Sequence, residues 1–228
     1  MKYVVSFIVG LTVGVAAFAL LMYYNPFSAP QTISPLAVSE NPMLNLQYSV
    51  VPDDSIFYTN DGESSTAPFP AGADELWEPT VNATRVLVTE LSDARGSSLG
   101  IGIKFSTDSE ATRLLNSEAL VDSVWHIHLP QSGTFFVEQT ENYWAYLRDI
   151  VIRARLNSTD SWRGAWSRVV TTGPNALGTG RALGGSGRYA GIEGEAVEIL
   201  NATAYSSASG PVAMNGMLTI ALPESSSP

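Results

Sequence analysis

The chain has 228 residues, of which 45% are hydrophobic and only 15% charged, so it can build a core and is unlike a disordered chain. It contains no cysteine, which excludes disulfides, thiolate metal sites and a cysteine nucleophile. Its net charge is −10. Because an acidic surface repels phosphate groups, nucleic acid is not expected as a partner.

Residues 1–24 predict a transmembrane helix that anchors the chain. The run from Tyr3 to Tyr24 carries no charge, and at about 1.5 Å per residue a helix of this length crosses the hydrocarbon core of a bilayer. Lys2 is the only basic residue before Arg85. The positive-inside rule therefore predicts a single-pass protein with a cytoplasmic N-terminus and a periplasmic or extracellular domain.

A cleaved signal peptide is the alternative interpretation of this segment. Its cleavage signal would be poor, because Ala29 has the bulky Phe27 at the −3 position. Gly10 and Gly14 have the G-x-x-x-G spacing that lets two membrane helices approach closely, so a homodimer is one oligomeric state that the sequence allows.

The remaining chain divides into a tether, one domain and a tail. Residues 25–43 contain four prolines among small polar residues and are expected to form an extended spacer. Residues 44–222 are expected to form the β domain with an N-terminal strand extension, and residues 223–228 a disordered tail. The proline- and glycine-containing loop that ends near residue 79 is long enough for a lid or rim.

Alternation of apolar and polar residues predicts many short strands in the domain. They are expected at 44–50, 55–59, 81–91, 99–105, 124–129, 134–138, 151–156, 166–171, 196–205 and 212–222. Gly100 and Gly102 leave one strand face bare, which is typical of a strand that another segment approaches closely. Helical patches are predicted after Thr107, where Glu110 completes a capping box, and at 143–151.

Roughly eight to ten short strands favour an all-β fold with minor helices. An antiparallel barrel of about eight strands is the predicted architecture, because closure removes exposed strand edges. The arginine-rich bases and the short anchor indicate a bacterial source.

The segment 178–194 is rich in glycine, including Gly184, Gly185, Gly187, Gly191 and Gly194. A dinucleotide-binding loop needs a strand before it and an amphipathic helix after it, and the short segment that follows leads into a strand pattern instead. These glycines are therefore expected to serve the backbone geometry of a turn, with Tyr189 plugging the end of the barrel.

The motif Gly-Gly-Ser-Gly-Arg-Tyr-Ala-Gly-Ile-Glu-Gly at 184–194 resembles the turn of the allene oxide cyclase and dirigent superfamily. The resemblance extends over about 80–222 and implies an eight-stranded barrel with a largely apolar cavity, often assembled as a trimer. The family's cyclases use a cavity carboxylate and a bound water, but no glutamate here aligns to that role. Dirigent proteins carry basic residues where this chain has Ala190 and Glu193, so the resemblance implies the fold and not the reaction.

His126 and His128 are the only histidines, and they share a strand face, as metal ligands do in several enzymes. Glu138 is the only nearby third ligand. The alternative is that Trp125 faces the core while the histidines face solvent or the polar side of the barrel. No metal or cofactor is expected.

A ligand site is predicted at Trp125, His126, His128, Glu138 and Tyr189, while no catalytic residue is assigned. Acids that could enter a cavity are Glu75, Glu90, Glu138, Glu193, Glu195 and Glu198.

The leading hypothesis is a membrane-anchored envelope module that binds a small apolar ligand or a protein partner. The alternatives are an isomerase or cyclase acting on a lipid-derived or phenolic intermediate, and a purely structural envelope protein. A buried carboxylate or histidine inside the barrel favours the enzyme, whereas a cavity filled by tryptophan and leucine favours the structural protein.

Overall fold

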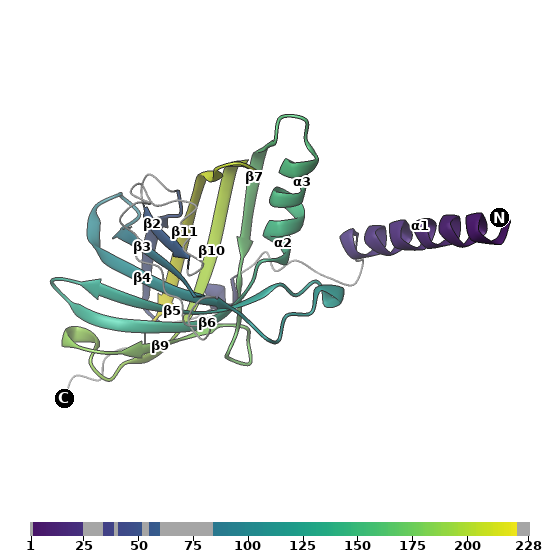
Figure 1. Cartoon of the computed structure of the whole chain (residues 1–228). Coiled ribbons are helices and arrows are strands. Elements are labelled where there is room, and N and C mark those ends of the chain that lie inside the picture. The colour runs from purple at the N-terminus through teal and green to yellow at the C-terminus, as the bar shows by residue number, and fades with distance from the viewer. Residues whose placement is uncertain (1, 25–33, 39–40, 52–54, 60–83, 223–228) are drawn as a thin grey trace.

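Eight strands of alternating polarity close into an antiparallel barrel, as the sequence predicts (Figure 1). The computed structural model describes residues 2–24, 34–38, 41–51, 55–59 and 84–222. The barrel strands are β1 (Met43–Ser49), β3 (Arg85–Ser92), β4 (Ser98–Asp108), β5 (Leu120–Leu129), β6 (Gly133–Asn142), β9 (Gly180–Gly184), β10 (Glu193–Ser206) and β11 (Gly210–Ala221). They are hydrogen bonded in the order β1-β11-β10-β9-β6-β5-β4-β3, and the pairing of Gln47 with Ser92 closes the circle.

Three further strands lie beside the barrel and open it at one end. β2 (Ser55–Thr59) pairs with the first half of β3, and β8 (Thr171–Gly173) pairs with β6. β7 (Ser161–Val169) pairs with the second half of β10, whose first half pairs with β9. The hydrogen-bonding partner of β3 changes from β1 to β2 along its length, and that of β10 changes from β9 to β7. The barrel therefore splays at the end where β2 and β7 are the partners.

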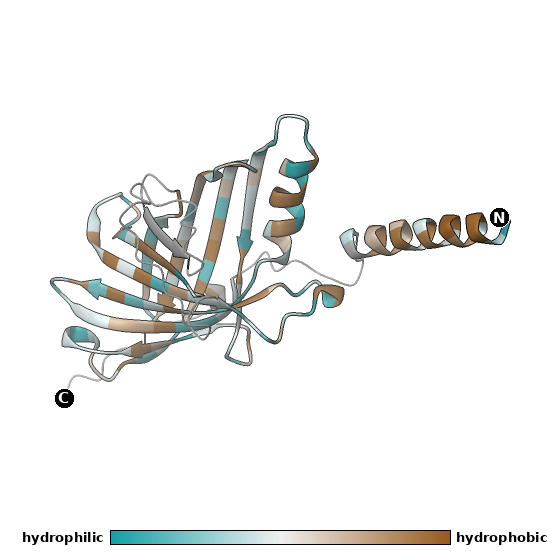
Figure 2. Cartoon of the chain, viewed as in Figure 1, coloured by the Kyte–Doolittle hydropathy of each residue, from teal (hydrophilic) through white to brown (hydrophobic). Residues whose placement is uncertain are grey.

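Helix α1 (Lys2–Tyr23) projects away from the domain, and its side chains are exposed and almost wholly apolar (Figure 2). By length and composition it is the one helix among the described residues that could cross a membrane. The short helix η1 (Pro35–Val38) lies within the predicted tether. Its Leu36 is buried against Val169 and Val197 on the outer side of the barrel.

Residues 144–156 form one continuous helical segment made of α2 (Trp144–Tyr146), the π-helical η5 (Leu147–Val151) and α3 (Ile152–Leu156). The helix predicted at 143–151 is confirmed, whereas the strand predicted at 151–156 is wrong. Ile150 and Ala154 are both fully buried, and their spacing of four residues places them on one helix face. This periodicity continues the helix beyond the predicted end.

The helix predicted after Thr107 is also wrong. β4 runs to Asp108, and the amide of Ser109 donates to the carbonyl of Leu120, which continues the ladder with β5. Only the single turn η4 (Leu114–Asn116) is helical in this connection. Pairing with β5 therefore overrides the local capping signal. The loop expected to end near residue 79 lies outside the described residues.

The glycine segment joins β9 to β10 through the short turn η6 (Gly187–Tyr189) and not through a phosphate-binding helix. The amides of Gly185 and Ser186 both donate to the carbonyl of Thr134, so they are engaged within the protein. Tyr189 is buried and packs on Phe135, with 4.8 Å between ring centroids. The segment thus closes this end of the barrel, as predicted.

Asparagine substitutions in this turn distinguish two causes of destabilisation, steric crowding of an added side chain and strain of the backbone at positive φ. Gly187 and Gly191 both have positive φ, of 62° and 71°. A Cβ at Gly187 would lie 2.5 Å from the carbonyl oxygen of Ser132, while a Cβ at Gly191 meets nothing within 4 Å. Since asparagine tolerates positive φ, Gly191→Asn should change the melting temperature little. Gly187→Asn should lower it by several degrees, corresponding to about 1–3 kcal/mol. Equal melting temperatures for the two variants would contradict the turn geometry.

Candidate functional site

A carboxylate lies at the centre of the barrel interior. Glu198 of β10 is fully buried, and both of its oxygens accept hydrogen bonds. The Lys104 ammonium donates to the two oxygens, at 2.8 and 3.0 Å, and the indole N–H of Trp125 donates to Oε2 at 3.0 Å. The Tyr48 hydroxyl and the Gln139 amide complete this set of donors. Glu198 is therefore held as an anion by four side chains from four other strands.

Two glycines make room for the aromatic donors of this cluster. Tyr48 lies opposite Gly216 in the β1–β11 ladder, and a Cβ at Gly216 would lie 2.0 Å from the Tyr48 ring. A Cβ at Gly102 would lie 2.8 Å from the Trp125 ring. The bare face predicted at Gly100 and Gly102 thus faces the core, where the Trp125 indole occupies the free space.

The second carboxyl of the cluster belongs to Glu141 at the end of β6. It is fully buried, and its Oε1 accepts from the Lys104 ammonium at 2.5 Å and from the Gln139 amide at 3.1 Å. Its Oε2 is buried with no hydrogen-bond partner among the described residues. The Tyr143 hydroxyl lies 3.5 Å from Oε1.

These groups divide their protons unequally. Burial, and then the nearby charge of Glu198, raises the pKa of Glu141 to about 8. Burial is also the largest influence on Glu198 and would raise its pKa, but the Lys104 charge and the hydrogen bonds from Lys104, Tyr48 and Trp125 together lower it to about 2. Burial disfavours the Lys104 ammonium, yet Glu141 and Glu198 raise its pKa above the ordinary value. At neutral pH Lys104 and Glu198 are therefore charged and Glu141 is protonated, so the cluster is neutral overall.

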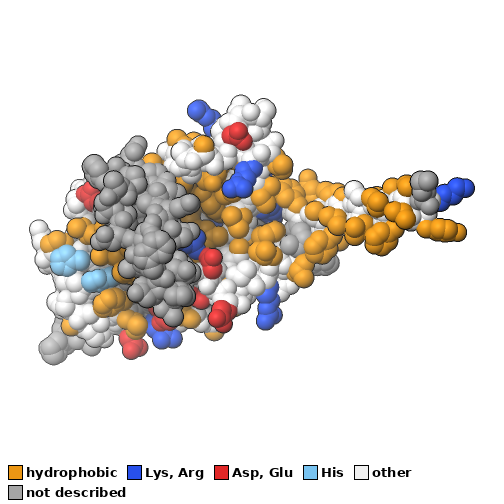
Figure 3. Space-filling view, viewed as in Figure 1, with side chains coloured by type: hydrophobic (Ala, Val, Ile, Leu, Met, Phe, Trp, Pro, Cys, Tyr) orange, Lys and Arg blue, Asp and Glu red, His pale blue; other side chains and the backbone are white. Residues whose placement is uncertain are grey.

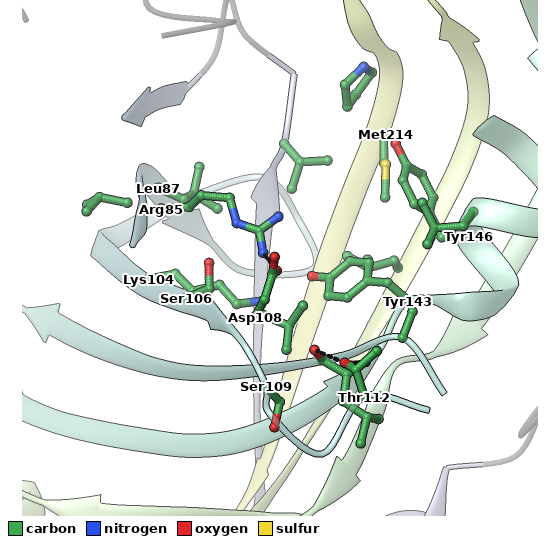
Figure 4. Close-up of a pocket in the computed structure, with 18 of the residues that line it drawn as sticks. Arg85, Leu87, Lys104, Ser106, Asp108, Ser109, Thr112, Tyr143, Tyr146 and Met214 are labelled. Carbon is green, nitrogen blue, oxygen red and sulfur yellow. Dashed lines mark hydrogen bonds and ion pairs between the residues drawn. The ribbon is translucent and has the colours of Figure 1, made fainter. Parts of the chain in front are cut away.

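A pocket of about 470 Å³ leads from the surface to this cluster (Figure 4). Lys104, Tyr48 and Tyr143 line its inner part. Its walls are mainly apolar and include Leu87, Leu120, Leu147, Leu200 and Met214. Figure 4 shows Tyr143 and Tyr146 projecting from the helical side toward the strands that carry Lys104 and Asp108. Burial raises the pKa of the Tyr143 hydroxyl, so it remains a hydrogen-bond donor at neutral pH.

A charged pair stands at the edge of the same pocket. The Arg85 guanidinium donates to the Asp108 carboxylate, and both side chains are largely exposed. Because the pair is solvated, it contributes little to stability. The Arg85–Asp108 pair places charged groups at the edge of a pocket whose walls are mainly apolar.

The five residues predicted to bind a ligand are not among those that line this pocket. Trp125 lies in the core and reaches the cluster through Glu198. His126 stacks on Phe136 outside the barrel, while His128 and Glu138 are exposed. Figure 3 shows both histidines at the end of the domain opposite α1, and Tyr189 closes that end. A ligand-binding role for these five stays a prediction.

The histidine face also has no third ligand in the described part of the chain. No group of three His, Cys, Asp or Glu side chains is placed there to hold a metal ion. Glu138 instead faces Arg181, with 3.9 Å between Oε2 and the guanidinium.

Sequence reasoning included Glu198 among six acids but missed Lys104 and Glu141. Of the other five, Glu90, Glu138 and Glu193 are exposed, Glu195 is half-buried, and Glu75 lies outside the described residues. Two signals could have found the missed pair. Lys104 is the only lysine after Lys2 and shares the bare face of Gly100 and Gly102. Glu141 has the same strand parity as the buried Phe135 and Val137.

No model of a known protein family and no curated protein matches this sequence. Two of the solved structures that match it in fold are described as a Diels–Alderase and a cyclase. One is the Diels–Alderase AbmU from Streptomyces koyangensis, with a TM-score of 0.41 and 11% identity over 83% of this chain and 72% of that one. The other is described as a nonspecific heme-binding cyclase that catalyses a 4 + 2 cycloaddition during neoabyssomicin biosynthesis, with a TM-score of 0.40 and 12% identity over 83% and 71%. A likeness of this degree does not identify the ligand or activity of this chain.

The raised pKa of Glu141 predicts a loss of stability as pH increases. Because the folded protein holds this proton up to about pH 8, whereas the ordinary pKa of the carboxyl is 4.5, the contribution to stability is complete below about pH 4.5 and disappears as pH rises through 8. The melting temperature of the full chain in detergent should fall by about 3–5 °C per pH unit across this window. Glu141→Gln, a neutral isostere, should flatten the profile, whereas the exposed Glu138→Gln should retain it. A Glu141→Gln profile as steep as that of the parent would contradict the assignment.

Removal of the lysine should be strongly destabilising. Lys104→Met leaves the Glu198 carboxylate buried without a counter-charge, which costs about 3–5 kcal/mol. The matched comparison is the double variant Lys104→Met with Glu198→Gln, in which no charge remains unpaired. Chemical denaturation should show that the double variant recovers part of the lost stability. A double variant no more stable than Lys104→Met would show that the ion pair is not the main interaction of Lys104.

Proposed function

We propose that this chain is a membrane-anchored barrel whose pocket binds a small, mainly apolar molecule through one polar oxygen. The observation that carries the proposal is the placement of two donors, Lys104 and Tyr143, at the inner part of an apolar pocket. Such a combination, with few polar groups among apolar walls, is typical of small-molecule sites, and the volume of about 470 Å³ lies in their range.

The unfilled interior argues against a purely structural role. In a structural barrel of this size, tryptophan and leucine side chains would fill the interior to native density. Here the indole of Trp125 lies in the core and is bonded to Glu198, while the pocket lined by Lys104 and Tyr143 remains open. Apolar residues could stabilise the fold as well as the buried cluster of Lys104, Glu141 and Glu198 does, so stability alone does not explain the cluster.

A specific observation favours isomerase or cyclase chemistry as the second candidate. Glu141 is a buried acid whose pKa of about 8 keeps it protonated at neutral pH. Lys104 and Tyr143 contact Glu141 and also line the pocket, so they connect this acid to a bound ligand. In such a reaction a proton passes from Glu141 to a ligand oxygen, and a proton from another position of the ligand later returns to Glu141. The ligand is thereby isomerised, and its atomic composition does not change.

The anchor proposal assigns α1 to the membrane with the N-terminus in the cytoplasm and the barrel on the periplasmic or extracellular side. The support is the length and apolar composition of α1, together with the lone Lys2 at its start. Gly10 and Gly14 have open space around them on α1, so self-association through this face is compatible with the structure.

Native mass spectrometry of the full chain, purified from its host membrane in mild detergent, tests ligand binding. We expect a small-molecule adduct that is released on activation. Leu147→Trp fills the pocket wall and should reduce the adduct at least about tenfold, a loss of about 1.4 kcal/mol. Leu177→Trp, at an exposed leucine outside the pocket, should retain it. An adduct equally abundant in both variants, or absent from the parent, would overturn the binding proposal.

The same extracts test the second candidate. If Glu141 supplies the proton, Glu141→Gln should bind a molecule of the same mass but different chromatographic retention, because isomers differ in shape and not in composition. If the molecules from parent and variant have identical retention, the isomerase proposal is wrong and only the ligand-binding proposal stands.

A further inference from the structure

The open end of the pocket and the end of α1 lie on the same side of the domain. Figure 1 shows α1 and the connection between β4 and β5 extending toward one side, whereas the β5–β6 and β9–β10 turns lie at the other. The Arg153 guanidinium of α3 donates to the Tyr23 hydroxyl at the end of α1, at 3.2 Å. Tyr189 closes the opposite end against Phe135. The pocket therefore opens toward the end of the domain from which the apolar helix leaves.

The β4–β5 connection holds two leucines outside the protein. Leu114 is 48% exposed and Leu115 is 64% exposed. Their position is fixed, because Arg113 and Glu118 exchange two backbone hydrogen bonds, at 2.9 and 3.2 Å, across the base of the turn. Moving such side chains out of water is favourable.

The arms of the loop that carries these leucines form part of the pocket wall. Ser109, Thr112 and Ala119, on the two arms of the same loop, line the pocket. The Thr112 hydroxyl donates to the carbonyl of Leu120 at 3.1 Å and accepts from its amide at 3.0 Å, which ties the two arms together. The two leucines therefore lie at the tip of a loop whose arms line the pocket.

We propose that the tip Arg113–Leu115 seats in the bilayer that holds α1, so that the pocket opens onto the membrane and takes an apolar molecule dissolved in it. This inference rests on the proposed membrane anchor and names the source of the proposed ligand. A bilayer is the occupant that fits, because α1 leaves the domain on this side and is itself apolar along its length. Arg113 beside the leucines suits the phosphate level of the interface.

Site-specific fluorescence tests the proposal directly, because the chain has no cysteine of its own. Leu115→Cys is labelled with a nitrobenzoxadiazole dye in the full chain, reconstituted in phosphatidylcholine vesicles with a minority of phosphatidylglycerol. Gln131→Cys, at the exposed β5–β6 turn on the far end, is the matched control. Vesicles with brominated acyl chains should quench the dye at residue 115 at least about twofold and leave the control unchanged.

The outcomes separate this inference from the anchor on which it rests. If the labelled chain floats with the vesicles and the dye at 115 is no more quenched than at 131, the tip does not enter the bilayer and only the anchor stands. A chain that does not float with the vesicles overturns the anchor and this inference together. Leu114→Cys is a second probe of the same tip and should give the same quenching, since that side chain is also exposed.

Discussion

A carboxylate removed from water costs several kcal/mol unless charge and hydrogen bonds compensate it, and Glu198 lies wholly inside the barrel. Lys104 supplies the charge, and Tyr48, Trp125 and Gln139 supply further donors. Each donor comes from a different strand, so the strands must meet in one register for the carboxylate to be satisfied. The Thr171 hydroxyl joins the same hydrogen-bond network, because it donates to the Gln139 side chain and accepts from the backbone amide of Glu198. The interior of the barrel is thus organised around one anion.

The cluster contains two acids and one base, so electroneutrality requires one additional proton. That proton resides on Glu141, the acid with fewer donors, whose Oε2 has no partner among the described residues. Apolar residues of similar volume often replace buried ion pairs at no loss of stability. A charged cluster at the base of an open pocket is therefore better explained by what it offers a ligand than by the stability it gives the fold. The Lys104 ammonium and the Tyr143 hydroxyl line the pocket, and the protonated Glu141 contacts both of them from behind.

The sequence was sufficient for the barrel, for most strand positions and for the closing turn at Gly184–Gly194, because alternation and glycine geometry are local signals. Two local signals failed where distant contacts decide. β5 pairs with the segment after Thr107, and burial of Ile150 and Ala154 continues the helix through 151–156. The site was harder to predict than the fold. Lys104, Glu141 and Glu198 are 37 and 57 residues apart along the chain, and only barrel closure brings them together.

The two ends of the barrel differ, because one is closed by side chains and the other holds the pocket. Tyr189 and the glycine turn close one end, and among the described residues the pocket that reaches Lys104 and Tyr143 lies toward the splayed end, where β3 and β10 pair with β2 and β7. An apolar ligand held in water outside that mouth would aggregate or partition elsewhere, whereas one dissolved in a bilayer stays available. The exposed leucine tip and α1 both lie at this end. The closed end therefore leaves a ligand the opposite end, which is the end that the proposal places at the membrane.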